Sequence, residues 1–195
     1  PNNPETFFRI ANLYSGEKKY ELAIKNYQKA IELKPNFMFA YLNLGNAQFE
    51  SEFYEESIVS FEKSISLNRN FIPSYLNICR ALLKLEKYDQ ALKYSDEVIK
   101  LDKMNIQANL IQGDINLFLK NFSNALKNYE RIIKIEPTHS LVLGKLLHAK
   151  MFLHDWKNYK KLLGDIIKYV DKNIMVIHPS ILLPLTDQPD LHLKA

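Results

Sequence analysis

The stretch YELAIKNYQKAIELKPNF at residues 20–37 returns in pattern 34 residues later, as YEESIVSFEKSISLNRNF at residues 54–71. The pattern appears twice more, as YDQALKYSDEVIKLDKMN at residues 88–105 and FSNALKNYERIIKIEPTH at residues 122–139. Each copy begins with an aromatic residue, has alanine or serine three positions later, and has isoleucine eleven positions after the aromatic. A fixed period of this length indicates a protein built from stacked structural repeats.

The period extends over most of the 195 residues. The aromatic column comprises Tyr20, Tyr54, Tyr88, Phe122 and Trp156, and the isoleucine column comprises Ile31, Ile65, Ile99, Ile133 and Ile167. An earlier column of small residues comprises Ala11, Gly45, Cys79 and Gly113, and Leu147 departs from it. Because small residues let two helices approach closely, each unit is predicted to be a pair of antiparallel helices of about 14 residues.

On these columns, residues 4–172 resemble the tetratricopeptide repeat (TPR) family. The resemblance implies an all-α fold, a right-handed superhelix of antiparallel helix hairpins with a concave surface. Four units are expected at 4–37, 38–71, 72–105 and 106–139, and a degenerate fifth at 140–173. Residues 174–195 are expected to form a linker and the start of a helix that leads to a C-terminal domain absent from this sequence.

The composition agrees with a helical protein in a reducing compartment. Five glycines and eight prolines are too few for a turn-rich all-β fold. The single cysteine, Cys79, cannot form an intrachain disulfide, so we expect a cytoplasmic protein. No apolar run approaches the roughly 18 residues of a membrane span. The net charge of +4 arises from a lysine-rich stretch at 145–172, which we interpret as a solvated helix face. We therefore expect neither nucleic-acid nor membrane binding.

The sequence offers no recognisable catalytic chemistry. The five histidines lack the spacing of metal ligands, and no glycine-rich phosphate loop is present. Cys79 occupies the small-residue column, where a buried and inert thiol is expected. We predict no catalytic residue, no metal site and no cofactor, and we do not expect this chain itself to be an enzyme.

In the TPR family the first helix of each repeat lines the concave surface, with the fifth, sixth and ninth positions among those that face a ligand. The sixth positions here are Arg9, Asn43, Asn77, Ile111 and Lys145, and the ninth are Asn12, Asn46, Arg80, Asp114 and His148. An amide both donates and accepts, so a row of asparagines could hydrogen-bond an extended peptide backbone. The other interpretation is a solvated helix face in a chain rich in asparagine.

The fifth positions make this surface partly apolar. The candidate peptide-binding residues are therefore Asn12, Asn43, Asn46, Asn77, Arg80, Phe8, Leu42 and Leu76. An extended peptide with some hydrophobic side chains would suit such a groove.

The C-terminal stretch indicates a more specific function for a peptide-binding repeat domain. It contains His154-Asp155-Trp156 and later Asp187-Gln188-Pro189-Asp190-Leu191-His192-Leu193. This order resembles the segment that joins the repeats to the catalytic domain in O-linked N-acetylglucosamine transferases and their Spindly-like relatives. The resemblance implies that the chain is the substrate-recruiting domain of a protein O-glycosyltransferase. Asn43 and Asn77 match that family's substrate-holding asparagines, whereas Arg9, Ile111 and Lys145 depart from them.

The alternative is a stand-alone TPR scaffold or a co-chaperone-like adaptor for protein complex assembly. A clamp for the C-terminal carboxylate of chaperones needs basic groove residues, and Phe8, Pro73 and Asn77 stand where the family places them. Both hypotheses predict a protein or extended peptide in the concave groove. A homodimer through the terminal repeats, such as the one that contains Phe7 and Phe8, is a further possibility.

Overall fold

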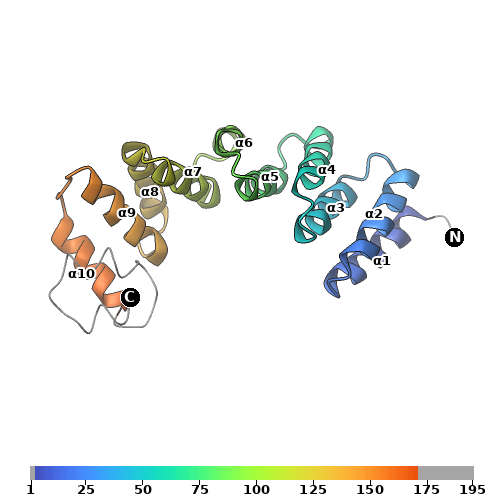
Figure 1. Cartoon of the computed structure of the whole chain (residues 1–195), viewed down its shortest axis with the longest axis horizontal. Coiled ribbons are helices and arrows are strands. Elements are labelled where there is room, and N and C mark those ends of the chain that lie inside the picture. Colours follow the sequence, from blue (N-terminus) through green and yellow to red (C-terminus); the bar gives the residue numbers. More distant parts are fainter. Residues whose placement is uncertain (1–2, 171–195) are drawn as a thin grey trace. The chain divides into compact units, whose positions relative to one another are not determined.

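The computed structural model describes residues 3–170 (Figure 1), so the expected linker at 174–195 and its transferase-like motif lie outside the described residues. The described secondary structure is entirely α-helical, which confirms the predicted all-α class. The helices are α1 (Pro4–Gly16), α2 (Tyr20–Leu33), α3 (Met38–Glu50), α4 (Tyr54–Leu67), α5 (Ile72–Lys84), α6 (Tyr88–Leu101), α7 (Ile106–Phe118), α8 (Phe122–Ile135), α9 (Ser140–Phe152) and α10 (Tyr159–Val170).

The described chain divides into two compact units. The N-terminal unit ends at Lys103 and contains α1 to α6, and the C-terminal unit begins at Met104 and contains α7 to α10. In the N-terminal unit α1 packs on α2, α3 on α4 and α5 on α6, while α2 also contacts α3 and α4 contacts α5. In the C-terminal unit α8 contacts both α7 and α9, and α9 contacts α10. Each unit is therefore a stack of helix pairs, as the period predicts.

The small-residue column brings the two helices of a pair together. A Cβ on Gly45 would lie 2.6 Å from Cε1 of Phe61, and a Cβ on Gly113 would lie 2.5 Å from Cε1 of Tyr129. Both rings are fully buried. The aromatic ring of the second helix thus rests directly on the backbone of the first, which only glycine permits at this separation.

The fifth helix pair, α9 and α10, has a large residue in the small-residue column. Leu147, which departs from the small column, is buried in a cluster with Leu162 and Ile166 of α10. Trp156 does not begin a helix as the other aromatics of its column do, because α10 starts three residues later, at Tyr159. Trp156 is 53% exposed. Its ring packs edge-to-face with the Tyr159 ring, with the ring centres 5.4 Å apart.

Left-handed turns join the two helices of each pair, again with the 34-residue period. The residues with positive φ are Lys18 (59°), Glu52 (64°), Glu86 (56°), Lys120 (61°) and His154 (52°), with Asn158 (59°) an additional one before α10. In each of the five periodic turns, the residue that follows the positive-φ residue donates its backbone N–H to the carbonyl oxygen five positions earlier. For example, Phe53 N lies 2.9 Å from the carbonyl oxygen of Gln48. These bonds cap the first helix and offset the cost of a left-handed conformation in a non-glycine residue.

Replacing Gly45 by alanine should destabilise the N-terminal unit by about 1–3 kcal/mol, because the added Cβ would press into a fully buried ring. Gly16 provides a matched control in a helix, since nothing lies within 4 Å of the Cβ that alanine would add there. Gly16→Ala should stabilise the protein by up to about 1 kcal/mol. Urea unfolding midpoints measure both changes, and equal midpoints for the two variants would refute the packing described here.

Candidate binding surface

All eight candidate peptide-binding residues lie on α1, α3 and α5, the first helices of the pairs in the N-terminal unit. Contacts between α1 and α3 and between α3 and α5 set these helices side by side. The structure therefore gathers the predicted residues on neighbouring helices of one unit.

The asparagines on these helices bind one another. Asn43 donates its Nδ2 hydrogen to Oδ1 of Asn12 at 2.9 Å, and Asn77 donates to Oδ1 of Asn46, also at 2.9 Å. We call these two contacts the amide pairs. Each joins the ninth position of one repeat to the sixth position of the next, across 31 residues. The side chains predicted to form a row thus form a ladder between helices.

The first amide pair is completed by a tyrosine from the second helix. The Tyr27 hydroxyl donates to Oδ1 of Asn12 at 2.7 Å, so this oxygen accepts two hydrogen bonds. Burial raises the pKa of Tyr27, which keeps the hydroxyl protonated as a donor at neutral pH. Phe61 stands at the equivalent position beside the second pair and has no hydroxyl to donate.

A cavity of about 380 Å³ adjoins the second amide pair. It is lined by Asn46, Phe49, Glu50, Phe61, Asn77 and Arg80, so it contains three of the predicted residues. We call it the Arg80 pocket. Its walls combine two amide groups, one cation, one carboxylate and two aromatic rings, which are groups that can recognise a polar or charged side chain.

The Arg80 side chain is oriented by two neighbours. Its Nη1 lies 3.4 Å from Oδ1 of Asn77, and its guanidinium carbon lies 4.7 Å from the centre of the Phe49 ring. The contact with the ring is a cation–π interaction that leaves the guanidinium exposed. Phe49 and Glu50 were not among the predicted site residues. Phe49 occupies the twelfth position of its repeat, which is another position that the TPR resemblance implies to face a ligand.

The predicted apolar residues differ from the amides in their surroundings. Phe8, Leu42 and Leu76 are half-buried, and none of them lines the Arg80 pocket. The Phe8 ring lies 4.8 Å from the Phe37 ring and 5.9 Å from the Tyr27 ring, and it packs against the core of the first pair. Phe8 thus supports the position of α1.

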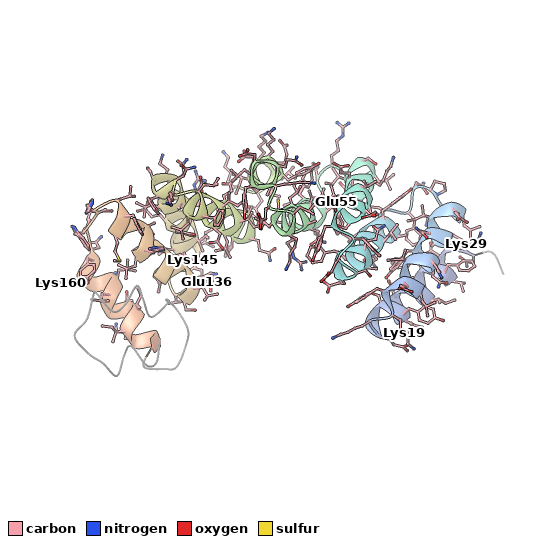
Figure 2. The ribbon with its side chains drawn as sticks, in the orientation of Figure 1. Lys19, Lys29, Glu55, Glu136, Lys145 and Lys160 are labelled. Carbon is pink, nitrogen blue, oxygen red and sulfur yellow. The ribbon has the colours of Figure 1, made fainter. Side chains whose placement is uncertain are left out.

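The C-terminal unit uses charge where the N-terminal unit uses amides. Lys145, labelled in Figure 2, places its Nζ 2.7 Å from Oδ1 and 2.5 Å from Oδ2 of Asp114. The Tyr129 hydroxyl donates to Oδ1 of Asp114 at 2.8 Å, and burial, aided by this carboxylate, raises the pKa of Tyr129. These residues occupy the positions of Asn12, Asn43 and Tyr27, so the same geometry is built from an ion pair.

Three further features of the described residues bear on their chemistry. Cys79 is fully buried, and burial raises the pKa of its thiol to about 12, which suppresses the reactive thiolate. Within residues 3–170, no group of three or more His, Cys, Asp or Glu side chains is arranged to hold a metal ion. None of the described helices is long and apolar enough to cross a membrane.

Replacing Asp114 by alanine should destabilise the C-terminal unit by about 1–3 kcal/mol, because the Tyr129 hydroxyl and Lys145 lose their shared acceptor. The double variant Asp114→Asn with Lys145→Asn rebuilds the amide pair and should recover most of that loss. Thermal unfolding of the three proteins measures the comparison. A double variant no more stable than the alanine variant would contradict the equivalence of the two arrangements.

Comparison with protein families identifies the repeat. A family model described as tetratricopeptide repeat matches residues 40–71, 72–103 and 106–139, and one described as TPR repeat matches residues 12–52. Over 46 residues the chain is 48% identical to the anaphase-promoting complex subunit CDC27 of Saccharomyces cerevisiae. That match covers 24% of this chain and only 6% of the length of CDC27.

Solved structures share the fold. The crystal structure of MamA protein has a TM-score of 0.77 at 18% identity, and the match covers 87% of this chain and 93% of that one. A MamA fragment from Desulfovibrio magneticus RS-1 has a TM-score of 0.77 at 14% identity, covering 88% and 97% of the two chains. YrrB, described as a TPR protein with an unusual peptide-binding site, has a TM-score of 0.68 at 23% identity, covering 83% and 84%. At these identities the likeness shows the fold alone.

Proposed function

Because the chain belongs to the tetratricopeptide repeat family, we propose that it is a scaffold that binds proteins through extended peptide segments. The observation that carries the proposal is the Arg80 pocket, where Asn46, Asn77 and Arg80 converge beside the Phe49 ring. The peptide-binding site named for YrrB and the place of CDC27 in a multisubunit complex support a binding role.

The amide pairs suit this role because they order the side chains before a ligand arrives. An asparagine amide has two N–H donors and an oxygen that can accept two hydrogen bonds. Asn77 uses one donor on Asn46, which leaves its second N–H available to a peptide carbonyl. A side chain already held in one rotamer loses less entropy when the peptide binds, which favours affinity.

Removing one complete amide pair should weaken peptide binding without leaving either asparagine unpaired, although Arg80 loses its 3.4 Å contact with Oδ1 of Asn77 and keeps only the Phe49 ring. We expect Asn46→Ala with Asn77→Ala to lower the affinity about tenfold, since each lost hydrogen bond contributes about 1 kcal/mol. The probe is a 12-residue peptide selected from a random phage-displayed library on the immobilised protein, titrated by calorimetry.

The control for this titration is Gln28→Ala with Gln90→Ala, which removes two exposed amides from the second helices α2 and α6. This control should bind the peptide as the parent protein does. Failure of any peptide to be enriched, or equal loss of affinity in both double variants, would reject the amide surface as the site. Circular dichroism of each variant separates loss of binding from loss of fold.

A finer hypothesis is that the scaffold recruits acceptor proteins for an O-linked N-acetylglucosamine transferase. It rests on the sequence around Asp187 to Leu193, outside the described residues, and on Asn43 and Asn77 at that family's asparagine positions. The relatives reported above favour the scaffold in its general form. The reading frame that follows Ala195 in the native gene, and transfer assays on the Asn46 and Asn77 variants, would decide whether sugar transfer depends on this surface.

A further inference from the structure

Apolar side chains gather at the ends of the helix pairs in the C-terminal unit. Leu119 follows α7, Phe152 ends α9, and Leu153 and Trp156 lie between α9 and α10. Their exposed fractions are 39%, 55%, 38% and 53%. Phe122, the first residue of α8, stacks on Phe152 with ring centres 4.3 Å apart and an interplanar angle of 7°. We call these five residues the hairpin-end patch, since the stack joins the ends of two successive pairs.

Exposed positive charge lies close to this patch in the chain. Four exposed lysines lie next to it in the chain: Lys120, Lys157, Lys160 and Lys161. Within residues 3–170 none of the four forms an ion pair. The single carboxylate of the α9–α10 loop, Asp155, is bound by Lys150 Nζ and by the backbone N–H of Lys157 at 3.0 Å. The surface is therefore both apolar and cationic.

Two of these lysines oppose the electrostatics of their own helix. Lys160, labelled in Figure 2, and Lys161 stand in the first turn of α10, which contains no acidic residue. The positive end of a helix dipole disfavours cations and favours anions. An anionic partner at this end of α10 would interact favourably with both lysines and with the dipole.

We propose that the hairpin-end patch docks on the surface of an anionic lipid bilayer. Trp156, Phe152 and Leu153 would enter the interfacial layer, where aromatic side chains are favoured, and the lysines would contact the negative headgroups. This contact is peripheral and independent of peptide binding by the N-terminal unit. The proposal differs from the expectation of no membrane binding, which rests on the composition and on the lack of an apolar run long enough to span a membrane.

The local geometry favours a bilayer over a nucleic acid or a protein segment. Base stacking needs open aromatic faces, and Phe152 offers at most one, because Phe122 covers the other and His148 packs against its edge with ring centres 5.0 Å apart. Trp156 is 53% exposed, and the oligonucleotide described below tests whether it stacks on bases.

A protein segment would be expected to use an apolar groove, but none of the five patch residues lines the cavity of about 470 Å³ in this unit. Lys157 and Lys161 do line that cavity, so the lysines border it while the apolar patch lies outside it. The patch is instead built from helix ends and loops, which suit insertion into an interface.

Trp156 is the only tryptophan of the chain and so reports directly on the patch. On adding vesicles of phosphatidylcholine with 30% phosphatidylserine to the full chain, its emission should shift to the blue and be quenched by brominated acyl chains. Pure phosphatidylcholine vesicles and soluble phosphoserine should leave the emission unchanged. Lys160→Gln with Lys161→Gln should lower the vesicle partition coefficient at least about tenfold.

The charge-matched control is Lys25→Gln with Lys93→Gln, two exposed lysines of the N-terminal unit, and it should partition as the parent chain does. Phe152→Ser should weaken partitioning, whereas Phe53→Ser, at a residue of similar exposure in the N-terminal unit, should not. Three results would overturn the proposal: no response to anionic vesicles, a blue shift that depends on protein concentration without lipid, or a response to an oligonucleotide alone. The second result would assign the patch to self-association.

Discussion

The close approach of the two helices within a pair is the constraint on which the rest of the structure depends. Where Gly45 or Gly113 stands on the first helix, an aromatic ring of the second helix lies against bare backbone. That contact fixes the depth at which the second helix sits. It also fixes the position of the tyrosine hydroxyl at the end of the ring. The Tyr129 hydroxyl therefore donates a hydrogen bond to Asp114, the residue that follows Gly113. Packing thereby orients the ninth position of the repeat, and the ninth position orients the sixth position of the next one.

The fold was predictable because its determinants are local and periodic. Side-chain volume and the spacing of apolar residues alone indicate helix pairs, and the helices α2, α4, α6 and α8 each begin at the aromatic residue of the column. The left-handed turns were harder to predict from the sequence, because Lys18 and Glu52 adopt a positive φ at positions where glycine is the usual residue. The division after Lys103 was not predicted either, since the period continues through it unbroken. The first helices on the two sides of this division differ at one buried position. There α5 buries Tyr75, and α7 buries Asn109 at the equivalent position.

The helices that carry the candidate residues were predictable, and the bonding of these residues was not. Repeat positions place Asn12, Asn46 and Arg80 on first helices, as expected from the sequence. The mutual pairing of the amides escaped prediction because the ninth and sixth positions were treated as separate rows at a spacing of 34. The relevant spacing is 31, which joins one repeat to the next. At that spacing the sequence also pairs Asp114 with Lys145, the latter named above as a departure from the asparagine row.

The two kinds of pair have different consequences for a ligand. An amide pair joins neutral groups and keeps donors available, so the N-terminal unit can bind a peptide without first breaking its own contacts. Lys145 and Asp114 neutralise each other, and a peptide that engaged either charge would have to compete with a close ion pair. We therefore assign the proposed peptide recognition to the amide pairs and Arg80. Within the described residues, the C-terminal unit has lysines that form no ion pair at the ends of its helix pairs, among them Lys160, and these are the charges that the proposed bilayer contact would use.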